Sequence, residues 1–76
     1  MYEEDARKII LLQANAQKAG LEDDSALRDL ITFEMQEVAR GCIENAMPAV
    51  DVMDYCHRVN ALVGNVFKQN ELNALI

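Results

Sequence analysis

The scarcity of residues that interrupt regular backbone structure constrains the fold of this chain more than any other feature. Its 76 residues include three glycines and one proline, too few for the many tight turns of an all-β sandwich or barrel. The apolar residues are mainly Ala, Leu, Ile, Val and Met, with four aromatic residues in the whole chain. Such a composition suits interlocking helices better than strands. We therefore predict an all-α fold.

Breaks in the apolar spacing of three and four residues divide the chain into three predicted helices, at about 3–19, 24–46 and 49–69. Gly20 can end the first helix because glycine readily adopts the left-handed conformation, and Pro48 ends the second. The segment Glu22-Asp23-Asp24-Ser25 offers side chains that can cap the second helix. Asn70 marks a break before an apolar tail, which leaves room for a short C-terminal fourth helix. The prediction is a single domain, residues 1–76, built as a small helical bundle.

Two glycines, Gly41 and Gly64, fall inside the predicted second and third helices. Each costs a helix interior about 1 kcal/mol relative to alanine. Either the backbone approaches a neighbour closely at these positions, or they are glycines tolerated at the surface. The sequence favours neither interpretation.

The first predicted helix carries four successive apolar residues at positions 9–12. Residues about 100° apart point in every direction around a helix, so part of this run would be exposed unless it meets another surface. A core of this size also rarely supplies much stability by itself, which favours a second copy. We predict a dimer or docking surface formed by this run and the apolar tail: Ile9, Ile10, Leu11, Leu12, Leu72, Leu75 and Ile76. The alternative is a first helix that is central in the bundle and buried on two sides.

The formal net charge of −6 opposes direct binding to nucleic acid or to anionic membranes. A helix-turn-helix DNA reader is also excluded, because the third predicted helix begins with Asp51 and Asp54 where basic and amide side chains are needed. An acidic surface suits a basic protein partner. The predicted partner-binding residues are Glu34, Glu37, Glu44, Asp51 and Asp54. The alternative is an ordinary solvated face, partly neutralised by Arg40.

Candidate chemistry is sparse in this sequence. Asp54 with His57, and Glu34 with Glu37, have the three-residue spacing by which one helix can present two ligands to a metal. These residues lie mostly off the apolar stripes, whereas the ligands of helical metal centres project inward, so a solvated polar face is preferred. Cys42 and Cys56 fall on apolar stripes and are expected to be small buried hydrophobic residues with reduced thiols. We predict neither catalytic activity, nor a metal site, nor a cofactor.

The leading expectation is therefore a non-enzymatic protein–protein interaction module: a small acidic regulator or inhibitor of a larger complex. A nucleic-acid-processing complex is one such target, and a phage-encoded anti-defence protein is one such inhibitor. The alternatives are a metal-binding helical enzyme or carrier built at a dimer interface, and a structural oligomer subunit. The chain shows no secretory leader and no apolar run long enough to span a membrane, which favours the cytoplasm.

Overall fold

The computed structural model describes residues 1–20 and 25–76, and these residues form four helices without a strand among them. Helix α1 spans Tyr2–Lys18, α2 spans Ser25–Glu44, α3 spans Ala49–Leu62 and α4 spans Gln69–Leu75. The all-α prediction is confirmed, with four helices in the described residues rather than three. The predicted cap at residues 22–24 lies outside the described residues.

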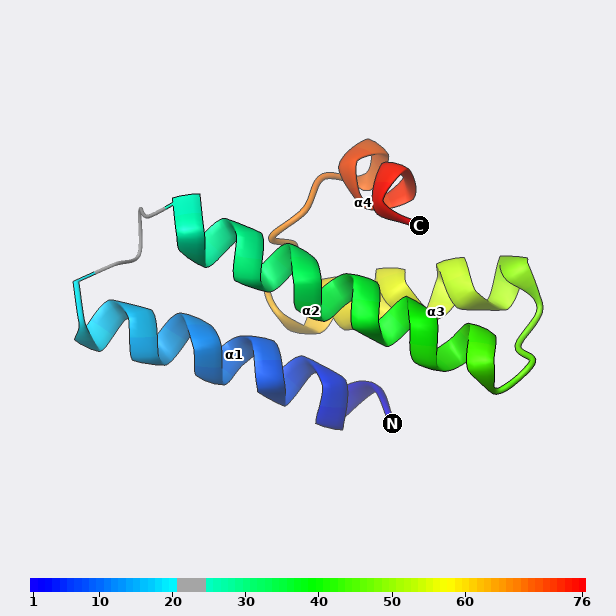
Figure 1. Ribbon diagram of the computed structural model, residues 1–76, viewed down its shortest axis with the longest axis horizontal. Coiled ribbons are helices and arrows are strands. Elements are labelled where there is room, and N and C mark those ends of the chain that lie inside the picture. Colours follow the sequence, from blue (N-terminus) through cyan, green and yellow to red (C-terminus); the bar gives the residue numbers. More distant parts are fainter. Residues whose placement is uncertain (21–24) are drawn as a thin grey trace.

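Helices α1 and α2 run antiparallel side by side, α3 packs against both, and α4 follows on α3 (Figure 1). All four helices and the α3–α4 connection contribute side chains to one buried cluster. Its members are Ala6, Ile9, Ile31, Met35, Ala39, Cys42, Val52, Cys56, Val59, Val63, Phe67 and Leu72. Within α2 and α3 these positions recur every three or four residues, which places them on one face of each helix.

Helix α2 ends in a left-handed turn that leads directly into α3. The backbone N–H of Met47 donates to the Cys42 carbonyl at 3.1 Å, and that of Ala46 donates to the Ile43 carbonyl at 3.0 Å. This pair of bonds is the Schellman arrangement, which satisfies carbonyls left free at a helix end. The left-handed position is occupied by Ala46, with φ of 60°, although glycine is the usual residue there. Pro48 then sits at the N-cap of α3.

Helix α3 ends seven residues earlier than predicted, so the prediction of one helix over 49–69 is wrong. Gly64, with φ of 90°, takes the left-handed position after the helix, and Asn65 follows with φ of 53°. The Asn65 N–H donates to the Asn60 carbonyl at 2.8 Å, which completes a second Schellman end. Gly64 is therefore a helix terminator, a role that neither sequence interpretation included. At Gly41, an added Cβ would meet no described atom of a neighbouring element within 4 Å, so the backbone of α2 does not approach another described element closely there.

The α3–α4 connection is held by a buried side chain of α3. Asn60 is 3% exposed, and its amide donates to the Phe67 carbonyl at 3.0 Å while its oxygen accepts from the Phe67 N–H at 3.1 Å. The side chain thus pairs with the backbone of Phe67 much as a neighbouring strand would. This pairing fixes where the chain crosses back, and Phe67 and Leu72 consequently enter the core.

Arg28 at the start of α2 also binds this connection. Its guanidinium donates to the Val66 carbonyl at 2.9 Å and to the Glu71 carboxylate at 3.1 Å, and it lies 4.7 Å from the centre of the Phe67 ring. Three contacts from one side chain therefore join α2 to the connection and to α4.

Candidate functional site

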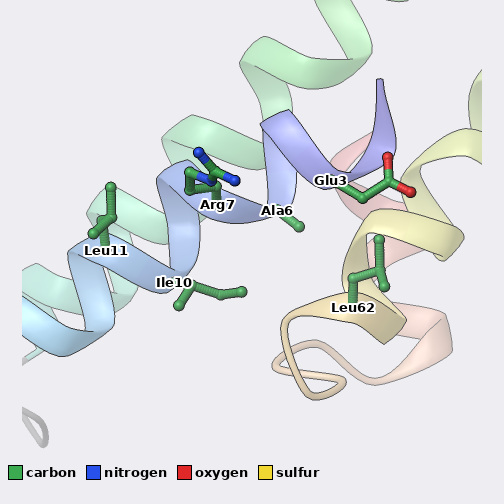
Figure 2. Close-up of a pocket in the computed structure, with 6 residues that line it drawn as sticks. All are labelled: Glu3, Ala6, Arg7, Ile10, Leu11 and Leu62. Atoms are coloured by element: carbon green, nitrogen blue, oxygen red, sulfur yellow. The ribbon is translucent and has the colours of Figure 1, made fainter.

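A shallow apolar groove runs between α1 and the end of α3. Its volume is about 320 Å³, and Ala6, Ile10, Leu11 and Leu62 line it together with Glu3 and Arg7 (Figure 2). Ala6 is buried, whereas Ile10, Leu11 and Leu62 are 45%, 54% and 49% exposed. Three large apolar side chains that remain half in water beside a recess form a surface suited to a protein partner.

The predicted self-association residues separate into buried and exposed groups. Ile9 and Leu72 are fully buried in the core, so they are not accessible to a second molecule in this fold. Leu12 and Leu75 are half-buried, and Ile76 is 38% exposed. Ile10 and Leu11 are the members of the run that face outward. Leu62 lines the groove but was absent from the predicted set, because its place beside α1 depends on how α3 crosses that helix.

The predicted acidic face is divided by an internal ion-pair network. Arg40 donates to the Glu37 carboxylate from Nε at 2.8 Å, and it also pairs with Glu44 one helical turn further along. The hydrogen bond from Arg40 lowers the pKa of Glu37 below its usual value. Glu37 is therefore largely satisfied within α2, while Asp51 and Asp54 on α3 stay exposed. Glu34 is half-buried.

The chain turns from α2 into α3 at one end of the molecule (Figure 1). Exposed apolar side chains lie on the helix turns that flank this connection. Ile43 is 61% exposed in the last turn of α2, and Val50 is 68% exposed in the first turn of α3. Glu44 is exposed in the same turn of α2 as Ile43, Asp51 is exposed in the same turn of α3 as Val50, and Asp54 is exposed in the next turn of α3. We call these five residues the turn surface. The sequence pointed to its acids and missed its apolar members. The position of Ile43 could have indicated its exposure. It directly follows Cys42, which is buried, and consecutive residues on a helix point about 100° apart, so they seldom share one face.

The side chains considered as metal ligands do not converge. His57 Nε2 lies 2.9 Å from the Asn73 side-chain oxygen, which joins α3 to α4. Asp54 is exposed on α3. In the part of the chain that the structure describes, no three His, Cys, Asp or Glu side chains are grouped so that they could hold a metal ion.

The two cysteines are free thiols inside the core. Cys56 is fully buried and Cys42 is 7% exposed. Burial raises the pKa of the Cys56 thiol to about 11, with smaller contributions from Cys42 and Asp5. Burial likewise raises the pKa of Cys42. Thiols held in the neutral form are poor nucleophiles and poor metal ligands, so these side chains contribute to packing.

A polar link between α1 and α3 lies beside these thiols. The Tyr55 hydroxyl donates to the Asp5 carboxylate at 2.5 Å, and the Tyr2 ring lies 4.6 Å from the Tyr55 ring. Burial, followed by this hydrogen bond to a carboxylate, raises the pKa of Tyr55 well above its ordinary value. The hydroxyl therefore stays protonated and acts as a structural donor.

Over residues 1–20 and 25–76, no helix combines the length and apolar character that crossing a membrane requires. Comparisons with known protein families, with curated proteins and with solved structures find no match to this chain.

Proposed function

We propose that this chain is a non-enzymatic protein–protein interaction module, a small acidic regulator that inhibits a larger complex by occupying a basic surface on it. The observation that carries the proposal is the turn surface, where Ile43 and Val50 are 61% and 68% exposed beside exposed carboxylates. Apolar side chains supply contact area that is desolvated on binding, and the surrounding charges steer and orient the partner.

The net charge supports a partner of basic character. With a formal charge of −6, the chain is attracted to positively charged clefts, of the kind that nucleic-acid-processing proteins use for phosphate backbones. Occupation of such a cleft would block the nucleic acid. In this proposal the protein acts in the cytoplasm, where the two core thiols stay reduced. One specific version of the proposal is a phage-encoded inhibitor of a defence complex.

Affinity capture with matched variants tests the proposal. The tagged chain is used to capture proteins from cells that encode it, and the captured partner is purified and titrated against each variant. Val50→Ser with Asp54→Lys should weaken binding about 30-fold or more, because it removes an apolar contact and reverses a charge.

The control is Leu30→Ser with Asp29→Lys, which makes the same kinds of change at exposed positions near the start of α2. It should bind like the unaltered chain. Equal weakening by both variants, or by neither, would contradict the assignment of the turn surface as the partner-binding site.

A further inference from the structure

The outward face of α1 carries charges of opposite sign at its two ends. Glu3 lies in the first turn and Lys18 in the last turn, and both are exposed. At 100° per residue, Glu3, Arg7, Ile10, Leu11 and Lys18 fall within an arc of about 100° around the helix. We call this set the α1 stripe. Along the helix it presents the acidic Glu3, the basic Arg7, the apolar pair Ile10 and Leu11, and the basic Lys18.

The two neighbouring acids at the start of α1, Glu3 and Glu4, have different surroundings. The Glu4 carboxylate lies 3.9 Å from the N-terminal ammonium group, whereas the Glu3 side chain borders the apolar groove (Figure 2). In the middle of the stripe, Ile10 and Leu11 are about half exposed, with Leu62 of α3 beside them. A facing helix would thus meet apolar contacts at its centre, Glu3 and Arg7 on one side of them and Lys18 on the other.

We propose that a second copy of this chain covers the groove, with the two α1 helices packed antiparallel about a two-fold axis that passes between Ile10 and Leu11. In this register Ile10 of each copy faces Leu11 of the other, and Glu3 faces Lys18 of the other. The small Ala14 of the second copy lies opposite Arg7 and leaves room for its long side chain.

Charge complementarity selects this occupant and this register. A parallel pair would place Glu3 against Glu3 and Lys18 against Lys18, and an antiparallel pair shifted by one turn in one direction would place Arg7 against Lys18. Both arrangements oppose like charges. The shift by one turn in the other direction would place Glu3 against Ala14 and so lose the ion pair between Glu3 and Lys18. A two-fold interface repeats each favourable contact twice, so the α1 stripe is complementary to itself in the proposed register.

This dimer is independent of the proposed function, because it uses α1 and Leu62 and leaves the turn surface free. Molar mass in solution, measured by light scattering and sedimentation over a dilution series, is expected to approach twice the 8.5 kDa mass of the chain at high concentration. A molar mass of one chain at every concentration would overturn the proposal.

The apolar centre is tested by Leu11→Glu, which should weaken dimerisation about 30-fold or more because it places a carboxylate in the desolvated contact. The control is Leu30→Glu on α2, since Leu30 is 52% exposed and Leu11 is 54% exposed. The control should dimerise like the unaltered chain. Circular dichroism confirms that both variants remain helical. A dimer that Leu11→Glu leaves intact would place the interface elsewhere.

The register is tested by exchange of charge. Glu3→Lys alone and Lys18→Glu alone should each weaken the homodimer about 3- to 10-fold, because two ion pairs become two like-charge contacts. An equimolar mixture of the two variants should recover dimerisation as a heterodimer, and so should the double variant E3K/K18E. Failure of both to recover, with the single variants weakened, would exclude the antiparallel register.

Discussion

Ala46 holds a backbone conformation that glycine usually supplies. Its φ of 60° lies in the left-handed region, where the Cβ of an L-residue is crowded by the following carbonyl oxygen. The position is imposed by the two backbone hydrogen bonds that end α2 and direct the chain into Pro48. After α1 and α3, Gly20 and Gly64 occupy the left-handed position without this cost.

At the residue scale, Ala46→Gly should raise the free energy of unfolding by about 0.5–1 kcal/mol. The substitution relieves roughly 1–2 kcal/mol of left-handed strain, and the greater freedom of glycine in the unfolded chain offsets part of this gain. Urea unfolding followed by circular dichroism measures the change. The matched control is Ala61→Gly, which lies within α3 and should be destabilising. A loss of stability in the Ala46 variant would contradict the strain argument.

At the scale of elements, the break between α3 and α4 is the feature that sets the shape of the C-terminal half. The apolar spacing through Val59, Val63, Val66 and Phe67 is compatible with one uninterrupted helix. Instead the chain turns at Gly64, and Asn60 bonds to both backbone groups of Phe67. The turn lets Leu72 of α4 become fully buried, which a straight helix leading away from the core would not allow.

Asn60→Ala should lower the free energy of unfolding by about 2–3 kcal/mol, because it leaves the N–H and carbonyl of Phe67 buried without their partners. Thermal and urea unfolding give the magnitude. Asn70→Ala, at an exposed position of α4, serves as the control and should change stability by less than about 0.5 kcal/mol. If the two variants were equally stable, the pairing of Asn60 with Phe67 would not be holding the connection.

At the scale of the whole molecule, one core joins all four helices, and its two thiols report on how that core opens. Cys56 has no exposed surface, and it packs among residues contributed by α1, α2 and α3. A reagent can therefore reach this sulfur only after those helices separate. The neutral form of the thiol adds a second barrier to reaction, since the thiolate is the nucleophile.

In the variant Cys42→Ala, modification of Cys56 by an aromatic disulfide reagent at pH 8 should be at least about 100-fold slower in the native chain than in urea. In the unaltered chain, the rise in the Cys56 pKa from 9.0 to about 11 lowers the thiolate fraction at pH 8 about 100-fold, and burial, the main cause of this rise, is retained in the variant. The native rate should also increase with pH up to about 11. A native rate within tenfold of the unfolded rate would show that the core opens locally around α3.

The content of helix and the position of most helix ends follow from the sequence alone. The spacing of apolar residues sets the faces of the helices, and Gly20 and Pro48 interrupt the chain at the two places where the structure also turns. These are local properties, because each depends on residues within one or two helical turns. The acids of the turn surface could be named for the same reason, since their exposure follows from lying off the apolar stripes.

The tertiary structure decided the features that depend on residues distant in sequence. The end of α3 is set jointly by Gly64 and by the bonds between Asn60 and Phe67, and no periodicity reports that pairing. Which of positions 9–12 face outward depends on the side from which α2 and α3 pack against α1. That packing buries Ile9 and leaves Ile10 and Leu11 beside Leu62 at the groove. Periodicity identifies a helix and its apolar positions, but the direction in which a neighbouring helix crosses it is a property of the whole core.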